Sequence, residues 1–262
     1  MFLFRQNDIV KWSDFSGDIN PVHYRNCDAQ NPVQGMLIFV AIMEKLLATQ
    51  AANEAKAAGI ELLFRQHVCT ENKYYLSYDP GNRKLKVSDP NGQDNITGNI
   101  IYNDRPLRTR YLREEQIGEK LIVTRAEIDN FYLEFLSLFN EEADYRTFIC
   151  ALTFRKVIHS RSFLNLYDFK FSDLKNFLRE TNTLQINQSA LWISTPFLWR
   201  NLMSNPGDIT IMLSVCQSYD EKRCKYLRLF YYECHFDGVL MLKCRTTVIS
   251  LYPAEEGRID RS

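Results

Sequence analysis

The sequence has no excess of either charge and no long apolar run. Lysine plus arginine equals aspartate plus glutamate, 32 each, so no net field draws the chain toward nucleic acid or an acidic membrane. No apolar stretch reaches the length that a membrane-spanning helix needs. The N-terminal residues MFLFRQNDIV meet a charge after four apolar residues, which does not predict a signal peptide. We therefore expect no nucleic-acid partner and no membrane partner.

Motifs that would mark several other chemistries are also missing. The 7 cysteines form no CxxC pair, and their odd number favours scattered buried thiols over a disulfide framework or a zinc site. The sequence has no phosphate-cradling glycine loop, no metal-ligand spacing and no Ser/His/Asp arrangement at a nucleophile elbow. These absences predict a cytoplasmic protein without a bound metal.

What the sequence does contain is enough apolar material for a substantial core. Apolar residues make up 45% of the 262 residues and aromatic residues 13%, which argues against disorder. The length is long for one ordinary domain and comfortable for two small ones.

The first part of the chain predicts one long helix followed by strands. Residues 35–58 contain strong helix formers and no breaker, and Gly59 is a natural stop; residues 35–47 are apolar nearly all round. The segments IELLFRQHVCTENKYYLSYD, KLKVSD and ITGNIIYN then predict antiparallel strands separated by the turns PGNRK and PNGQDN. A buried helix wrapped by such a sheet is an α+β unit.

The second part repeats this order without repeating the sequence. Residues 104–120 are charged and poorly patterned, which predicts a linker. Residues 121–140 predict an apolar start and a helix, with a capping box at Thr124 and Glu127. Residues 143–164 predict a second, less cleanly apolar helix, and a short amphipathic piece and four strands follow. We therefore predict two α+β domains, residues 1–103 and 121–262.

One stretch carries a family likeness. FSGDINPVHYRN followed by NPVQGML resembles the signature of the MaoC-like, (R)-specific enoyl-thioester hydratases, also called hydratase 2. NPGDITIMLSV in the second half resembles the P-G-D segment with which a strand of that family begins. The family fold is the hotdog, a helix wrapped by an antiparallel sheet, so the resemblance implies a double hotdog of two fused units.

The resemblance also implies a reaction and its residues. Hydrating a trans-2-enoyl thioester adds hydroxide at Cβ and a proton at Cα, which requires an acid/base pair and donors for the thioester oxygen. By resemblance, Asp18 and His23 are that pair, and the Gly35 N–H at a helix start is the oxyanion hole. Asn20 and Ser16 would support the turn. The substrate would be a coenzyme A or acyl carrier protein thioester, without metal or redox cofactor.

Three departures from the family pattern qualify the comparison. Gln34 stands where the family has histidine, and it could orient the loop or contact substrate. The loop between His23 and Gly35 is shorter than in the family. The corresponding stretch of the second half, FLSLFNEEADYR, lacks the motif. We therefore expect one active site, on the first half, with the second half supplying part of the acyl pocket.

Two other functions stay open at this point. Taken singly, Asp18 suits a helix cap and His23 an ordinary residue, and only the joint motif favours catalysis. The departures suit a non-catalytic acyl-thioester binding protein, while Glu44 on the central helix suits a hotdog thioesterase. The three other histidines are expected to be structural: His67, His159 and His235.

The sequence leaves further properties undecided. These are the acyl chain length, the direction of reaction, and whether double-hotdog chains form a homodimer. Fatty-acid metabolism and a specialised route such as polyketide biosynthesis both fit the proposed chemistry.

Overall fold

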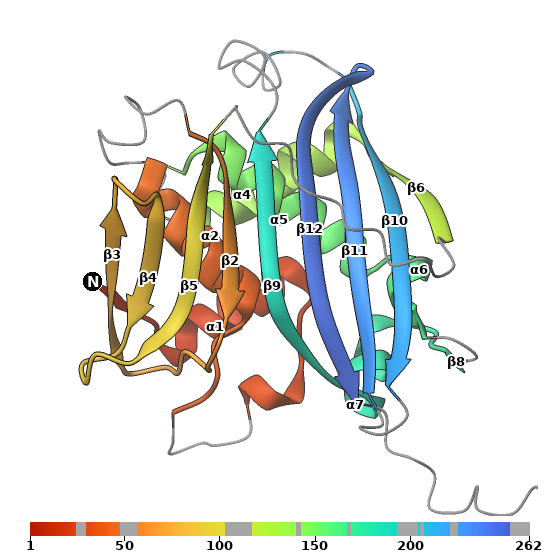
Figure 1. The fold of residues 1–262 in the computed structure, drawn as a ribbon. Helices are drawn as coiled ribbons and strands as arrows, with labels where there is room; N and C mark the ends of the chain where they lie inside the picture. The colour runs from red at the N-terminus through yellow and green to blue at the C-terminus, as the bar shows by residue number, and fades with distance from the viewer. Residues whose placement is uncertain are drawn as a thin grey trace, which may run out of the picture.

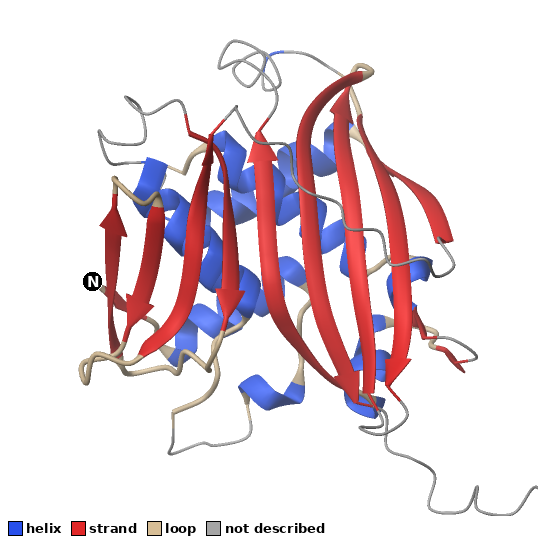
Figure 2. Ribbon diagram, viewed as in Figure 1, coloured by secondary structure: helices blue, strands red, loops and turns tan. Residues whose placement is uncertain are grey.

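The fold is an antiparallel sheet with helices packed on one face (Figures 1 and 2). The structure is a computed structural model that describes residues 1–24, 30–47, 57–102, 117–139, 143–166, 169–192, 204, 207–220 and 225–251. Ten strands form the main sheet in the order β1-β3-β4-β5-β2-β9-β12-β11-β10-β6. This architecture agrees with the predicted α+β class.

The first half supplies five strands and the elements that carry the motif. Its elements are β1 (Phe2–Leu3), α1 (Gln6–Ser16), the 3-10 helix η1 (Pro21–His23), α2 (Gly35–Leu47), β2 (Ala57–Phe64), β3 (Lys73–Asp79), β4 (Lys84–Ser88) and β5 (Asp94–Tyr102).

The second half supplies the other five strands of the main sheet and the short pair β7-β8. Its elements are β6 (Ile117–Val123), α4 (Arg125–Phe139), α5 (Tyr145–Ile158), α6 (Arg161–Leu164), β7 (Asn165–Leu166), β8 (Phe169–Lys170), α7 (Leu174–Glu180), β9 (Asn182–Trp192), β10 (Ile209–Asp220), β11 (Lys225–Phe236) and β12 (Val239–Leu251). The predicted capping box is present, since the Thr124 N–H donates to Glu127 Oε2 (2.9 Å).

The two halves have the same strand order and meet at equivalent strands. From the outer edge inward the first half runs β1-β3-β4-β5-β2, and the second runs β6-β10-β11-β12-β9. β2 and β9 pair antiparallel, with Ile60 opposite Ala190 and Leu62 opposite Gln188. The result is a continuous sheet with a pseudo-twofold arrangement about the β2–β9 seam.

Two helices fill the space behind this seam. α2 is buried from Met36 to Val40 and again at Ile42 and Met43, because its sequence is apolar on every side. α5 packs against α2 and is buried from Thr147 to Phe154, so it is the central helix of the second half. α1 and α4 flank this pair.

Three details differ from the sequence predictions. α1 is a helix over residues that showed no clear period, since its buried face includes Ile9, Trp12 and Ser16. Gly59 does not end the central helix but lies in β2, where a Cβ would come within 2.2 Å of the Ala190 carbonyl oxygen. Residues 48–56 lie outside the described part. β6 begins at Ile117, within the predicted linker, and the rest of that linker is not described.

Two properties of the described residues bear on the wider setting. No helix within the described ranges is long and apolar enough to cross a membrane. The cysteines in those ranges are free thiols: Cys69, Cys150, Cys216, Cys234 and Cys244.

Candidate functional site

The turn that follows α1 is fixed by a chain of short-range hydrogen bonds. Gly17 is left-handed (φ 78°), and its N–H donates to the Ser13 carbonyl (2.7 Å), which ends the helix. The Asp18 N–H donates to Ser16 Oγ (3.0 Å), and the Asn20 N–H donates to Asp18 Oδ1 (3.4 Å). Asp18 is therefore held half-buried at the start of a structured turn.

Asn20 ties this turn to the second half of the molecule. Its Oδ1 accepts the Val22 N–H (3.2 Å), which caps η1, and Pro21 occupies the first position of that helix. Its Nδ2 donates to the Thr183 carbonyl on β9 (3.1 Å). A single buried amide thus shapes the turn and fixes it against the sheet.

His23 ends η1 and has a defined tautomer. Its side chain is buried, and its Nδ1 lies 2.6 Å from the Pro32 carbonyl oxygen. A carbonyl oxygen only accepts hydrogen bonds, so Nδ1 carries the hydrogen and donates it. The other nitrogen of the neutral ring, Nε2, is then the acceptor and the basic atom.

Gly35 is the first residue of α2. The Gln34 carbonyl accepts the Ile38 N–H (3.1 Å), so the helical bonding begins here, and the first N–H groups are free of intrahelical partners. A Cβ on Gly35 would lie 2.6 Å from Oε1 of Gln185, which comes from β9. Glycine thus lets a side chain of the second half cover the start of α2.

Gln34 bonds to α1, at the serine that in turn bonds to the Asp18 carbonyl. Its side chain is fully buried, and its Nε2 donates to Ser13 Oγ (2.9 Å) and to the Ile9 carbonyl (3.5 Å). Of the two roles suggested by the sequence, this position favours orientation of the loop over contact with substrate.

One cavity brings four of the six predicted site residues together. Asp18, Asn20, His23 and Gly35 all line it, whereas Ser16 and Gln34 do not belong to its described lining. β9 adds the polar side chain of Gln185. Apolar side chains of both halves form much of the remainder, including Val33, Ile38, Phe64, Phe154, Ile158 and Val248. The cavity therefore combines the carboxylate and imidazole of the predicted acid/base pair with an apolar lining.

Two side chains of the second half also bond to the end of α1, just before the turn. Arg155 of α5 donates to the Phe15 carbonyl, and His159 Nε2 donates to the Ser16 carbonyl (3.2 Å). Both acceptors are terminal carbonyls of α1 that lack helical partners. Loss of hydration lowers the pKa of His159. His159 was predicted to be structural, and this contact gives it a structural position next to the site.

Glu44 lies in the contact between the central helices. Its carboxylate accepts the Asp144 N–H at the start of α5 (3.1 Å), and loss of hydration raises its pKa. It does not belong to the described lining of the cavity, so it does not share a site with Asp18. Of the other histidines, His67 lies at the cavity wall, and His235 lies beside Glu233 on β11.

Several supporting residues were not found from the sequence. Ser13 is buried, and its Oγ donates to the Asp18 carbonyl (2.7 Å) while accepting from Tyr24 and Gln34. No local motif marks such a residue. The one sequence signal for this role is that Ser13 lies five residues before Asp18, near the end of a capped helix.

Comparison with known proteins defines the fold class. No protein-family model matches the chain. No curated protein matches its sequence significantly. Among solved structures, a protein of Chloroflexus aurantiacus J-10-fl described as a MaoC domain dehydratase is similar, with a TM-score of 0.52 and 9% identity, over 97% of this chain and 93% of that one.

A second similar structure is a conserved hypothetical protein from Mycobacterium tuberculosis with a double hotdog fold. Its TM-score is 0.51 at 10% identity, over 95% of this chain and 93% of that one. At such identities the likeness concerns the fold alone, and together with the strand order it confirms the predicted double hotdog.

Proposed function

We propose that this chain is a hydro-lyase that hydrates trans-2-enoyl thioesters, or dehydrates (R)-3-hydroxyacyl thioesters. The observation that carries the proposal is the single cavity that Asp18, His23 and Gly35 share. The resemblance of FSGDINPVHYRN and NPVQGML to the MaoC-like hydratases supports the same assignment.

The acid/base roles follow from the two side chains. His23 Nε2 is the free basic atom, and Asp18 is a half-buried carboxylate whose turn is fixed by hydrogen bonds. Together they bind the attacking water, whose oxygen adds to Cβ as His23 takes its proton. The pair then returns one proton to Cα, so its own protonation state is restored.

The thioester oxygen gains charge during this step. The Gly35 N–H at the start of α2 is a donor at the positive end of a helix dipole, which stabilises such an oxygen. The apolar lining from both halves suits an acyl chain, and the thiol carrier would be coenzyme A or an acyl carrier protein. The reaction needs no metal or redox cofactor.

The direct test follows the loss of enoyl absorbance with crotonyl-CoA and longer enoyl-CoAs. Asp18→Asn and His23→Ala each remove one acid/base group, so we expect hydration to fall by roughly 10²–10⁴-fold. Asp14→Asn, an exposed aspartate of α1, and His235→Ala are the matched controls and keep wild-type rates.

Three outcomes would contradict the proposal. Hydration that survives both substitutions would remove the assigned roles. Release of free thiol without hydration would identify a thioesterase. Inactivity of the wild type on every enoyl-CoA and enoyl carrier protein would favour an acyl-thioester binding protein.

A further inference from the structure

The segment that joins α5 to β9 is longer than the one that joins α2 to β2, with residues 159–181 against residues 48–56. The longer segment contains α6, β7, β8 and α7. In Figure 1, α6 and β8 lie on the right beside β10, and α7 lies at the bottom, where β9 begins. Through α6 and α7 this segment reaches the candidate cavity.

α7 presents an apolar face to the interior. Leu174, Phe177 and Leu178 are buried at the i, i+3, i+4 spacing of one helix face, and Leu174 and Leu178 line the cavity. Lys175 and Arg179 are exposed on the opposite side. The helix is therefore a wall between the cavity and solvent.

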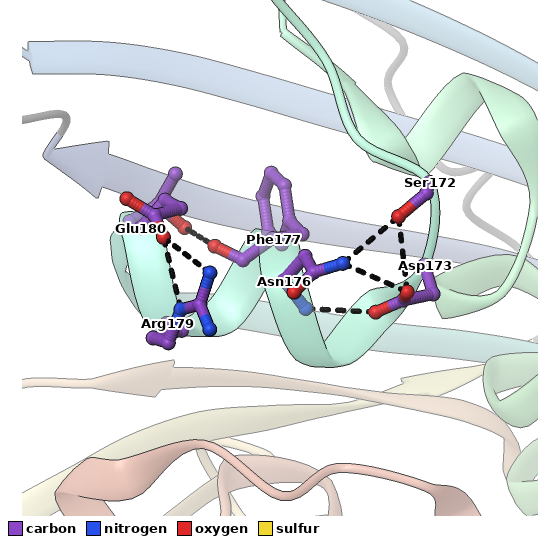
Figure 3. Close-up of polar contacts among 7 residues, drawn as sticks. Ser172, Asp173, Asn176, Phe177, Arg179 and Glu180 are labelled. Atoms are coloured by element: carbon purple, nitrogen blue, oxygen red, sulfur yellow. Dashed lines mark hydrogen bonds and ion pairs between the residues drawn. The ribbon is translucent and has the colours of Figure 1, made fainter.

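This short helix is fixed at both ends, as Figure 3 shows. At its start the Asn176 N–H donates to Asp173 Oδ1 (2.8 Å), and Asn176 Nδ2 donates to Ser172 Oγ (2.8 Å). At its end the Thr181 N–H donates to the Phe177 carbonyl (2.9 Å). Capping of this kind restrains a helix that is too short to be stable alone.

A fully buried arginine anchors the elements beneath the wall. Arg228 Nη2 donates to the carbonyls of Ser162 (3.0 Å), Phe163 (2.5 Å) and Asn165 (3.2 Å) at the end of α6. The guanidinium lies 5.1 Å from the ring centroid of Phe163 and 5.5 Å from that of Phe177. These two rings are 5.2 Å apart. Phe163, which also lines the cavity, is thereby coupled to α7.

We propose that α7 and Phe163 form a fixed wall that selects the acyl group by size, with Leu174 and Leu178 as specificity-determining residues. The proposal rests on the function proposed above and extends it to the substrate class. A capped helix packed on an anchored aromatic cluster cannot yield to a larger ligand without losing these contacts. The site therefore takes acyl groups with an apolar tail that stops at α7, and it rejects longer tails.

Two substitutions at one position test this wall in opposite directions. Leu178→Ala enlarges the cavity. Each further methylene of the acyl chain that the enlarged cavity buries should raise kcat/KM about fourfold relative to wild type. The ratio of kcat/KM for octenoyl-CoA to that for crotonyl-CoA should rise in Leu178→Ala and fall in Leu178→Phe. Lys175→Ala, on the exposed side of the same helix, is the control and should leave the ratio unchanged.

Binding separates this proposal from the assigned chemistry. Saturated butanoyl-CoA and octanoyl-CoA do not react by hydration, so calorimetric titration measures their affinities even if the wild type proves inactive. Leu178→Ala should strengthen octanoyl-CoA binding relative to butanoyl-CoA. A length preference that is the same in Leu178→Ala, Leu178→Phe and wild type, by kinetics and by binding, would overturn the proposal.

Discussion

Gly17 controls where the candidate acid/base residue Asp18 lies. Its φ of 78° is unfavourable for any residue with a Cβ, and a Cβ there would lie 2.3 Å from Nε2 of His159. The side chain of His159, from the second half, thus packs directly on the backbone that precedes Asp18. This residue links the stability of the fold to the geometry of the site.

Substitution of Gly17 by alanine should cost stability and activity together. We expect Gly17→Ala to lower the free energy of unfolding by about 1–3 kcal/mol, from left-handed strain and displacement of His159, and to lower hydration by moving Asp18. Urea unfolding and the enoyl assay measure the two effects.

A second glycine isolates the backbone contribution. Gly92 has a similar φ of 81°, but a Cβ there would meet nothing within 4 Å. Gly92→Ala should therefore show the strain without the contact and without loss of hydration. Equal stability losses in the two variants, with hydration intact in both, would contradict a positioning role for this contact.

The sequence was most informative where the chemistry is local. Asp18, Asn20 and His23 could be placed together because they belong to one short motif, and several of the bonds that shape its turn are local. Arg155 and Gln185 could not, since they reach the site from elements more than a hundred positions away. Such contacts depend on the packing of the two halves, which no local pattern records.

At the scale of elements, the contact between α2 and α5 contains the Glu44 carboxylate, whose charged form loses hydration there. Loss of hydration raises the pKa of Glu44 above its ordinary value of 4.5, although it accepts the Asp144 N–H. The native state therefore binds this proton more tightly than the unfolded state does. The stability that the protonated form provides is present below pH 4.5 and is lost as pH rises through the raised native pKa.

Replacement of this carboxylate should change the pH dependence of stability. The side chain at this position in Glu44→Gln cannot ionise. The melting temperature of the variant minus that of wild type should therefore increase as pH rises from 4 to 7, while the hydration rate stays within about twofold. Glu71→Gln, at an exposed position, is the control and should show no such trend. A thioester-processing activity that disappears in Glu44→Gln would contradict this interpretation and support the thioesterase.

Elements were predictable to different degrees for physical reasons. α2, α4 and the strands from β9 to β12 follow strong apolar periods and clear turns. α1 was missed because two of its buried positions, Ser13 and Ser16, are polar residues that pack through hydrogen bonds rather than apolar area. The start of β2 was mistaken for helix because Gly59 and its alanine neighbours suit either state locally.

At the scale of the whole molecule, the two halves share a sheet and a cavity. The β2–β9 seam continues the sheet, Asn20 bonds to β9, and Glu61 of β2 forms an ion pair with Arg245 of β12. The predicted division into residues 1–103 and 121–262 therefore separates two parts of the sequence that share one sheet and contact each other closely. The proposed catalytic residues lie on one half, and residues of both halves line the cavity around them.

This close contact between the halves predicts a single cooperative unfolding transition. Trp12 reports on the first half and Trp192 on the second, and both are buried. Two variants each keep one of these tryptophans, with the other and Trp199 replaced by phenylalanine. In each variant the urea midpoint measured by tryptophan fluorescence should match the midpoint measured by circular dichroism. Two separated transitions within one variant would show that the halves fold independently.

The most direct test of the central claim is the product formed from crotonyl-CoA in deuterated water, read by proton NMR. Hydration by the Asp18–His23 pair predicts 3-hydroxybutyryl-CoA with one deuterium at Cα, an intact thioester, and little product from Asp18→Asn. Crotonate with free coenzyme A, no conversion by the wild type, or full conversion by Asp18→Asn would contradict it.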